Sequence, residues 1–225
     1  AANTLVGNDQ NAACLELTGV GPKMRVMSEA IVSITGGDLG ILVDDKPLPR
    51  WAGVRVTKGS ILSSEGTRDG FRAYLAIAGG IDVPVILDSR STFLKGRFGG
   101  FDGRPLRQGD ILASLPLEAG RELKERALPQ DLEPLQYGNN HELRVILGPQ
   151  ENLFTTDSIS VLLNNEFTVT GNSDRVGYRL EGPKLAHKKS ADIISDGSPL
   201  GAIQVPGDGM PIILLADRGT TGGYP

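Results

Sequence analysis

The sequence predicts a mainly β protein with many short strands and a few short helices. Thirty glycines and fourteen prolines punctuate the 225-residue chain, and they separate short apolar runs in the way that turns separate strands. No repeat of fixed period links these runs, which disfavours a solenoid or a propeller. The content of 39% hydrophobic and 22% charged residues is that of an ordinary globular protein. Together these observations predict lobes of the barrel or sandwich type.

Ten segments carry alternating or β-rich apolar residues, and we expect each of them to form a strand. They are residues 14–18, 30–35, 53–57, 71–78, 110–114, 142–147, 166–170, 176–180, 202–205 and 211–216.

Helix signals are few. One short helix is expected to end at Leu163 after a cap at Thr156 or Asp157, because these side chains can accept a hydrogen bond from a first-turn amide. A second is expected over residues 88–94, with Asp88 or Ser89 as its cap. Both helices are accessories to the strands.

The stretch 117–140 separates two strand-rich halves, since it is rich in charge and proline and shows little alternation. We therefore predict an N-terminal lobe over residues 1–118, a linker over 119–140 and a C-terminal lobe over 141–225. The sequence lacks an initial Met and stops abruptly at Pro225. We expect that the ends were trimmed and that elements are absent at both.

Charge and cysteine content narrow the class of protein. The formal charge is −4, and the 23 basic and 27 acidic residues are interspersed, so neither nucleic acid nor an anionic membrane is an expected partner. Cys14 is the single cysteine and lies in an alternating apolar segment, which suits a small buried side chain rather than a nucleophile. A lone cysteine and the lack of a run of about 20 apolar residues predict a cytoplasmic protein.

Common catalytic signatures do not occur in the sequence. It has no Walker-type phosphate loop, no G-x-G-x-x-G motif and no G-x-S-x-G nucleophile elbow. His141 and His187 are far apart and have no second ligand at metal-binding spacing. We therefore predict no metal site.

Two polar, glycine-rich stretches are site candidates because glycine lets a backbone approach a ligand closely. In residues 78–110, Arg90, Ser91 and Thr92 offer a guanidinium and two hydroxyls to an anion. The alternative is a capped helix with a solvated arginine. In residues 171–183, Arg175 either pairs with Asp174, as a structural ion pair, or reaches into a cleft.

A third stretch, residues 195–225, is the densest in polar groups. The strand expected at 211–216 runs directly into Asp217, which can orient a donor or take a proton. Thr220, Thr221 and the amides of the following glycines can donate to a carboxylate, carbonyl or phosphate, and Gln204 can bind an amide. The alternative is a tight turn capped by Asp217. These residues indicate a polar small-molecule site and name no reaction.

Several long strings resemble the carboxyltransferase-like subunit of the allophanate hydrolase subunit 2 and Kip-antagonist family, in the order of that family and over nearly the whole chain. The strings are LVGNDQNAACLEL, AYLAIAGGIDVP, FGGFDGRPLRQGD, SDRVGYRLEGP and PLGAIQVPGDGMPIILLADRGTTGGYP. The resemblance implies two cyclophilin-like β-barrel lobes and a Kip-inhibitor-like or allophanate hydrolase subunit 1-like partner. The family usually carries glutamine where Gly219 stands here.

The resemblance further implies a subunit of an ATP-dependent amidolyase, with 5-oxoprolinase as the leading expectation and a third, lactam-utilising subunit in the complex. The substrate is then a small anionic amide, and ATP acts at the level of the complex. In that picture Arg90 and Arg175 hold the carboxylate, while Asp217 orients a group or takes a proton. The other expected substrate-binding residues are Ser91, Thr92, Gln204, Thr220, Thr221, Gly222 and Tyr224.

Two alternatives stay open. One is biotin-dependent carboxyl transfer of the urea carboxylase type, with biotin arriving on a separate carrier because the sequence has no E-A-M-K-M motif. The other is a regulatory subunit that binds a Kip-inhibitor-like protein and needs no intact cleft.

Overall fold

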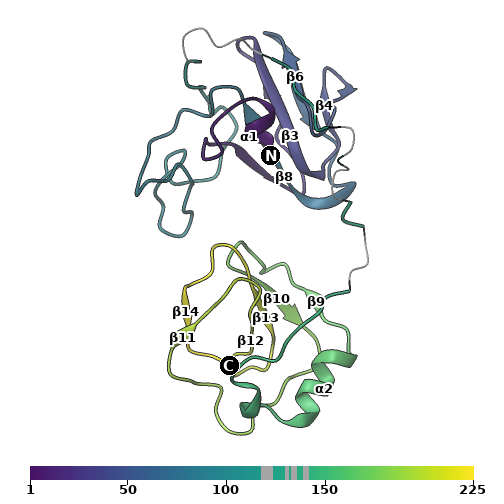
Figure 1. Cartoon of the computed structure of the whole chain (residues 1–225), viewed down its shortest axis with the longest axis vertical. Helices are drawn as coiled ribbons and strands as arrows, with labels where there is room; N and C mark the ends of the chain where they lie inside the picture. The colour runs from purple at the N-terminus through teal and green to yellow at the C-terminus, as the bar shows by residue number, and fades with distance from the viewer. Residues whose placement is uncertain (118–123, 130–131, 133–135, 139–141) are drawn as a thin grey trace. The chain divides into compact units, whose positions relative to one another are not determined.

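The computed structural model describes residues 1–117, 124–129, 132, 136–138 and 142–225. The chain divides into two compact units, Ala1–His141 and Glu142–Pro225, and each is described by itself (Figure 1). The predicted mainly β fold is confirmed, since the described residues hold fourteen strands, two α-helices and one 3-10 turn. Within these residues no helix has the length and apolar character needed to cross a bilayer.

The main sheet of the first unit is antiparallel, in the order β1-β8-β3-β6. Its strands are β1 (Leu15–Thr18), β8 (Asp69–Ile77), β3 (Ala30–Asp38) and β6 (Gly53–Val56). β3 lies in the middle and is buried without interruption from Ala30 to Thr35. Its β-branched residues suit a strand with a covered surface on both faces.

Side chains of β3 alternate between two apolar clusters, as the period of two in a strand requires. Val32 and Ile34 belong to the larger cluster, in which Ile34 has no exposed surface. Ile31 belongs to the smaller one, together with Ala76 and residues of the short helix α1 (Ala2–Leu5). Burial of each large aliphatic side chain stabilises the unit by about 1.5–3 kcal/mol.

A second sheet of the first unit has the order β2-β7-β4-β5. Its strands are β2 (Met24–Arg25), β7 (Ile61–Ser64), β4 (Ile41–Val43) and β5 (Lys46–Pro47). Asp44 and Asp45 join β4 to β5 with φ angles of 49° and 62°. Two positive φ angles are typical of the type I′ hairpin turn, and aspartate tolerates them better than most residues.

The second unit contains a four-stranded antiparallel sheet, β12-β13-β10-β9, and a two-stranded ladder, β11-β14. The strands are β9 (Thr168–Val169), β10 (Gly177–Glu181), β11 (Asp196–Gly197), β12 (Ile203–Gln204), β13 (Ile212–Leu214) and β14 (Thr221–Gly222). Among the described residues, the strand pairings do not close a barrel in either unit.

Two helical elements precede β9, namely η1 (Glu151–Leu153) and α2 (Thr156–Asn164). The expected helix ending near Leu163 is thus present, but the expected cap is wrong by a residue or two. Thr155 is the N-cap, and its hydroxyl accepts a hydrogen bond from the Ser158 amide at 3.2 Å. Asp157 lies in the first turn, where a carboxylate is favoured by the helix dipole.

The helix predicted over residues 88–94 is wrong. Leu87 and Asp88 have φ angles of 50° and 59°, and residues 86 and 89 form an isolated bridge around them. A second bridge joins Phe93 to Phe98, whose rings are in edge contact with centroids 5.5 Å apart. Positive φ angles and bridge pairing exclude a right-handed helix.

Two predicted strands, residues 110–114 and 142–147, are also wrong. In the first, Ser114 forms only an isolated bridge with Ile81. In the second, Leu143 and Ile146 are 74% and 96% exposed, and no described strand pairs with the segment. A strand needs a neighbour to accept its ladder hydrogen bonds. Each of the other eight expected segments contains a strand, namely β1, β3, β6, β8, β9, β10, β12 and β13.

Part of the predicted linker contacts the first unit. The Gly53 amide donates to the Arg126 carbonyl at 2.6 Å, and the Leu128 amide donates to the Trp51 carbonyl at 2.9 Å. Much of the remaining linker, and His141, lie outside the described residues. The lobe limits at 118 and 141 therefore stay a prediction.

Candidate functional site

In the second unit, β13 leads into a loop that brings Asp217 against Arg175. The Asp217 amide donates to the Arg175 carbonyl at 3.0 Å. The two side chains also pair in a bidentate manner, with Arg175 Nε 2.7 Å from Asp217 Oδ2 and Nη2 3.1 Å from Oδ1. The structure thus joins two residues that are 42 positions apart.

The sequence leaves open whether Arg175 pairs with Asp174 or reaches into a cleft, and the structure shows it paired with Asp217. Its guanidinium is oriented by the Asp217 carboxylate, while 39% of the Arg175 side chain stays exposed. The Asp174 carboxylate accepts the amides of Val176 and Gly177. Fixing a half-exposed guanidinium in one orientation prepares it for a planar anion.

A second group of contacts surrounds Gln204 at the end of β12. The Gln204 side-chain nitrogen donates to the Ser198 hydroxyl at 3.4 Å. Arg218 Nε donates to the Ser198 carbonyl at 2.7 Å, and Nη1 donates to the Leu215 carbonyl at 3.5 Å. Since Arg218 follows Asp217 in the chain, this group and the Arg175–Asp217 pair share one loop.

Ser198 and Arg218 lie beside the candidate site residues, and their sequence pattern does not single them out. Both lie in the polar 195–225 stretch, so composition pointed to their neighbourhood. Nothing in their spacing indicates that Ser198 is buried, with 7% of its surface exposed. Only the folded chain brings it between Gln204 and Arg218.

The remaining predicted residues of this stretch lie on or beside β14. The Thr220 carbonyl accepts the Ser198 amide at 2.9 Å, and Gly222 pairs with Asp196 in the β11-β14 ladder. The side chains of Thr220 and Thr221 are exposed, and Tyr224 is 42% exposed. These groups are therefore accessible to a ligand from solvent.

Arg90, Ser91 and Thr92 lie in the first unit, on the loop that replaces the predicted helix. One Nη of Arg90 donates to the Val83 carbonyl, and the Ser91 amide donates to the Ser89 hydroxyl at 3.1 Å. These contacts hold the loop together. The alternative of a capped helix with a solvated arginine is therefore wrong.

Thr92 packs directly on a glycine of the same loop. A Cβ at Gly100, whose φ is +51°, would lie 1.9 Å from Thr92 Oγ1. Glycine is needed here both for the backbone angle and for the close approach. The Thr92 hydroxyl is thus fixed in place by the fold of its own loop.

An ion pair that the sequence did not reveal closes the same loop. Arg104 Nη1 and Nη2 lie 2.7 and 2.9 Å from the two carboxylate oxygens of Asp110, and the Arg107 amide donates to Asp110 at 2.7 Å. The hydrogen bonds from Arg104 and then from Arg107 lower the pKa of Asp110 from 3.8 to about 2. The Arg104 guanidinium also lies over the Phe101 ring, 5.0 Å from its centroid.

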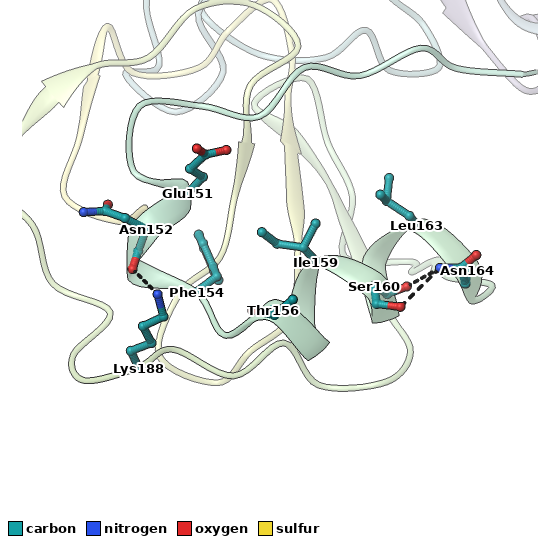
Figure 2. A pocket seen from close by; sticks show the side chains of 9 residues that line it. All are labelled: Glu151, Asn152, Phe154, Thr156, Ile159, Ser160, Leu163, Asn164 and Lys188. Atoms are coloured by element: carbon teal, nitrogen blue, oxygen red, sulfur yellow. Dashed lines mark hydrogen bonds between the residues drawn. The ribbon is translucent and has the colours of Figure 1, made fainter.

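A shallow pocket of about 550 Å³ lies elsewhere on the second unit, between η1 and α2 (Figure 2). Lys188 Nζ donates to the Asn152 carbonyl at 2.9 Å, and the Asn164 side-chain nitrogen donates to the Ser160 carbonyl at 2.8 Å, so some polar groups of the pocket wall bond to one another. None of the predicted site residues lines it. The lining residues are Glu151, Asn152, Phe154, Thr156, Ile159, Ser160, Leu163, Asn164 and Lys188.

Cys14 packs against the smaller apolar cluster, and burial raises the pKa of its thiol. A raised pKa leaves little thiolate near neutral pH, which suits a packing role. In the part of the chain that the structure describes, no group of three or more His, Cys, Asp or Glu side chains is arranged to hold a metal ion.

Comparison with known proteins identifies relatives over the whole chain. The chain is 36% identical over 226 residues to the C subunit of 5-oxoprolinase from Escherichia coli (strain K12), covering 100% of this chain and 70% of the relative. It is also 36% identical over 238 residues to urea amidolyase of Saccharomyces cerevisiae, covering 99% of this chain and 13% of that protein. The chain thus spans only part of each of these relatives.

A solved structure has the same fold. The crystal structure of Kluyveromyces lactis urea carboxylase matches with a TM-score of 0.86 and 34% identity, over 99% of this chain and 21% of that one. The profile of the family described as "Carboxyltransferase domain, subdomain A and B" matches residues 1–225. The chain therefore belongs to the carboxyltransferase domain, subdomain A and B, family.

Proposed function

We propose that the chain is a subunit of an ATP-dependent amidolyase, specifically a 5-oxoprolinase that converts 5-oxoproline to glutamate. The observation that carries this proposal is the 36% identity to the C subunit of 5-oxoprolinase from Escherichia coli over the whole chain. The proposed partners are a Kip-inhibitor-like or allophanate hydrolase subunit 1-like protein and a third, lactam-utilising subunit. The proposed location is the cytoplasm, where a single cysteine stays reduced.

The polar loop of the second unit offers groups that complement a small anionic lactam. In this proposal Arg175, oriented by Asp217, donates to the substrate carboxylate. The hydroxyls of Thr220 and Thr221 donate to the lactam carbonyl oxygen, where negative charge develops when the ring is attacked. Gly222 lets the substrate approach the backbone, and Tyr224 covers it.

Gln204 and Asp217 have the remaining roles. Gln204 binds the lactam amide, since its side chain has both a donor and an acceptor. Both Asp217 oxygens accept hydrogen bonds from Arg175, which supports orientation of the guanidinium as the main role of this carboxylate, ahead of proton transfer. Arg90, Ser91 and Thr92 form a separate proposed anion-binding group in the first unit.

Cofactors enter this proposal from outside the chain. ATP is bound by the assembled complex, where it supplies the driving force for ring opening. No residue of this chain is assigned to a metal, and biotin belongs only to the second candidate function below.

The test is reconstitution with the two proposed partners, ATP and 5-oxoproline, followed by assay of glutamate. We expect glutamate only when all three proteins are present. Arg175→Ala and Asp217→Asn should each lower kcat/KM about ten- to hundredfold, because each breaks a charge-assisted hydrogen-bonded pair. Arg179→Ala is the matched control, since Arg179 is an exposed arginine four residues further along the chain, on β10. Turnover that is unchanged in both variants removes the pair from the mechanism.

Biotin-dependent carboxyl transfer is the second candidate, because the identity to urea amidolyase of Saccharomyces cerevisiae is equally 36%. The amide of Gln204 is also suited to a ureido group, which the carried biotin and urea both contain. Transfer of carboxylate from a carboxybiotin carrier to urea, without glutamate formation from 5-oxoproline, would favour this function. A stable complex with neither activity, unaffected by the Arg175 and Asp217 variants, would favour the regulatory role.

A further inference from the structure

The Gln204 side chain presents an unused acceptor. Gln204 lies opposite Ile212 in the β12-β13 pairing and is half-buried. Its nitrogen donates to Ser198 Oγ, and its carbonyl oxygen accepts no hydrogen bond from any described residue. The Gln204 carbonyl oxygen is therefore free to accept a hydrogen bond from a ligand.

Ser198 makes a hydrogen bond through each of its three polar groups. Its amide donates to the Thr220 carbonyl at 2.9 Å, its carbonyl accepts from Arg218 Nε at 2.7 Å, and its hydroxyl faces the Gln204 nitrogen at 3.4 Å. Ser198 is buried, and its backbone contacts hold its Cα close to Gln204. The hydroxyl meets the nitrogen end of the Gln204 amide, and the oxygen end is left for a ligand.

Gly222 leaves the space that the amide occupies. A Cβ at position 222 would lie 2.0 Å from the Gln204 nitrogen and 2.9 Å from Ser198 Oγ. No side chain at 222 is compatible with this placement of Gln204. The backbone angle gives no separate reason for glycine here, because Gly222 does not have a positive φ.

We propose that Ser198 and Gly222 are positioning residues that turn the carbonyl oxygen of Gln204 toward the substrate, where it accepts a hydrogen bond from a substrate N–H. The inference rests on the proposed function and makes it more specific, since the preferred ligand is a secondary amide with a free N–H, such as 5-oxoproline. A ligand with a methyl group on that nitrogen is then rejected by a lost hydrogen bond and by steric contact.

Two variants test the proposal, and each has a matched control variant. Gly222→Ala introduces the clashing Cβ, whereas Gly197→Ala, one position away in the paired strand β11, meets no atom within 4 Å. Ser198→Ala removes the hydroxyl, and Ser158→Ala removes another buried hydroxyl of the same unit, which bonds to the backbone of Ala186. The two control variants therefore show how much of an effect comes from a loss of stability alone.

The functional arm measures discrimination between 5-oxoproline and N-methyl-5-oxoproline, as KM for the first and inhibition constant for the second, in the reconstituted complex. We expect the wild type, Gly197→Ala and Ser158→Ala to prefer the free N–H by about ten- to hundredfold. In Ser198→Ala and Gly222→Ala the preference should fall toward one, mainly through KM. A preference that survives both substitutions overturns the inference, because a merely structural role would not alter this ratio.

The structural arm does not depend on the reaction. Side-chain amide NMR of the full chain should show contacts between the Gln204 NH₂ protons and Gly222 Hα in the wild type and Gly197→Ala. The absence of these contacts in the wild type overturns the inference. If the wild-type complex forms no glutamate, the proposed function fails by itself. The same Gln204 signals are then titrated with urea: shifts that Ser198→Ala abolishes support N–H recognition, and no shift overturns it.

Discussion

Among the described residues, Asp110 is the carboxylate whose pKa is most clearly lowered. Two N–H groups of Arg104 and the Arg107 amide donate to it, and these bonds favour its charged form. The pKa of Asp110 falls to about 2 from its ordinary value of 3.8. A depressed carboxyl pKa means that the contacts favour the folded loop above pH 3.8 and that this contribution is lost as the pH falls through about 2.

We expect the ¹³C carboxyl resonance of Asp110 to titrate with a midpoint near 2. Replacing Arg104 by Met should move the midpoint up toward 3.8, because the first and largest cause of the shift is removed. A wild-type midpoint at 3.8 for Asp110 would contradict the structure of this loop.

Turns at the strand ends depend on glycine where backbone angle and space act together. Gly79, two residues after the end of β8, has a φ of +93°, and a Cβ there would lie 2.3 Å from the Leu115 carbonyl oxygen. Gly59, between β6 and β7, has a similar φ of +98° but meets no atom within 4 Å. The two positions separate the cost of the backbone angle from the cost of the clash.

Gly59→Ala should lower the free energy of unfolding by about 1–2 kcal/mol, the cost of a positive φ for an L residue. Gly79→Ala should lower it by about 2–5 kcal/mol, because backbone atoms must also move apart. Urea denaturation followed by circular dichroism measures both values. Equal losses in the two variants would show that the turn after β8 has room that the structure does not give it.

The packing of buried apolar side chains differs between the two units. Both clusters of buried apolar side chains found in the described residues lie in the first unit, on either side of β3. The proposed lobe boundary near residue 141 implies that each unit opens by itself. Amides of β3 and β8 should then exchange with solvent more slowly than those of the second unit.

Ile34→Ala should lower the stability of the first unit by about 2–5 kcal/mol, because Ile34 is fully buried and its loss leaves a cavity. Hydrogen exchange should speed up in β3 and β8 and stay unchanged in β10 and β13. Leu214→Ala, at a buried position of β13, should give the opposite pattern. If either variant accelerates exchange equally in both units, the predicted independence of the lobes is wrong.

The sequence by itself determined the mainly β class and the positions of the longer strands. Local alternation of apolar residues is enough to mark β3 and β8, since each presents a repeating pattern to its two faces. The same local signals did not reveal β2, β4, β5, β7, β11 or β14. Those strands have two to four residues each, which is too short for a repeating pattern, and a paired neighbour supplies their hydrogen bonds.

The same distinction between sequence and tertiary structure applies to the candidate site. Residue type identified Arg175, Gln204 and Asp217, because guanidinium, amide and carboxylate groups carry the chemistry that binds small polar ligands. The tertiary structure decided that Asp217 pairs with Arg175 and that Ser198 lies beneath Gln204. It also replaced the helix expected at 88–94 with a loop. Partners distant in sequence have no local signal, so only the folded chain selects among the contacts that each side chain can make.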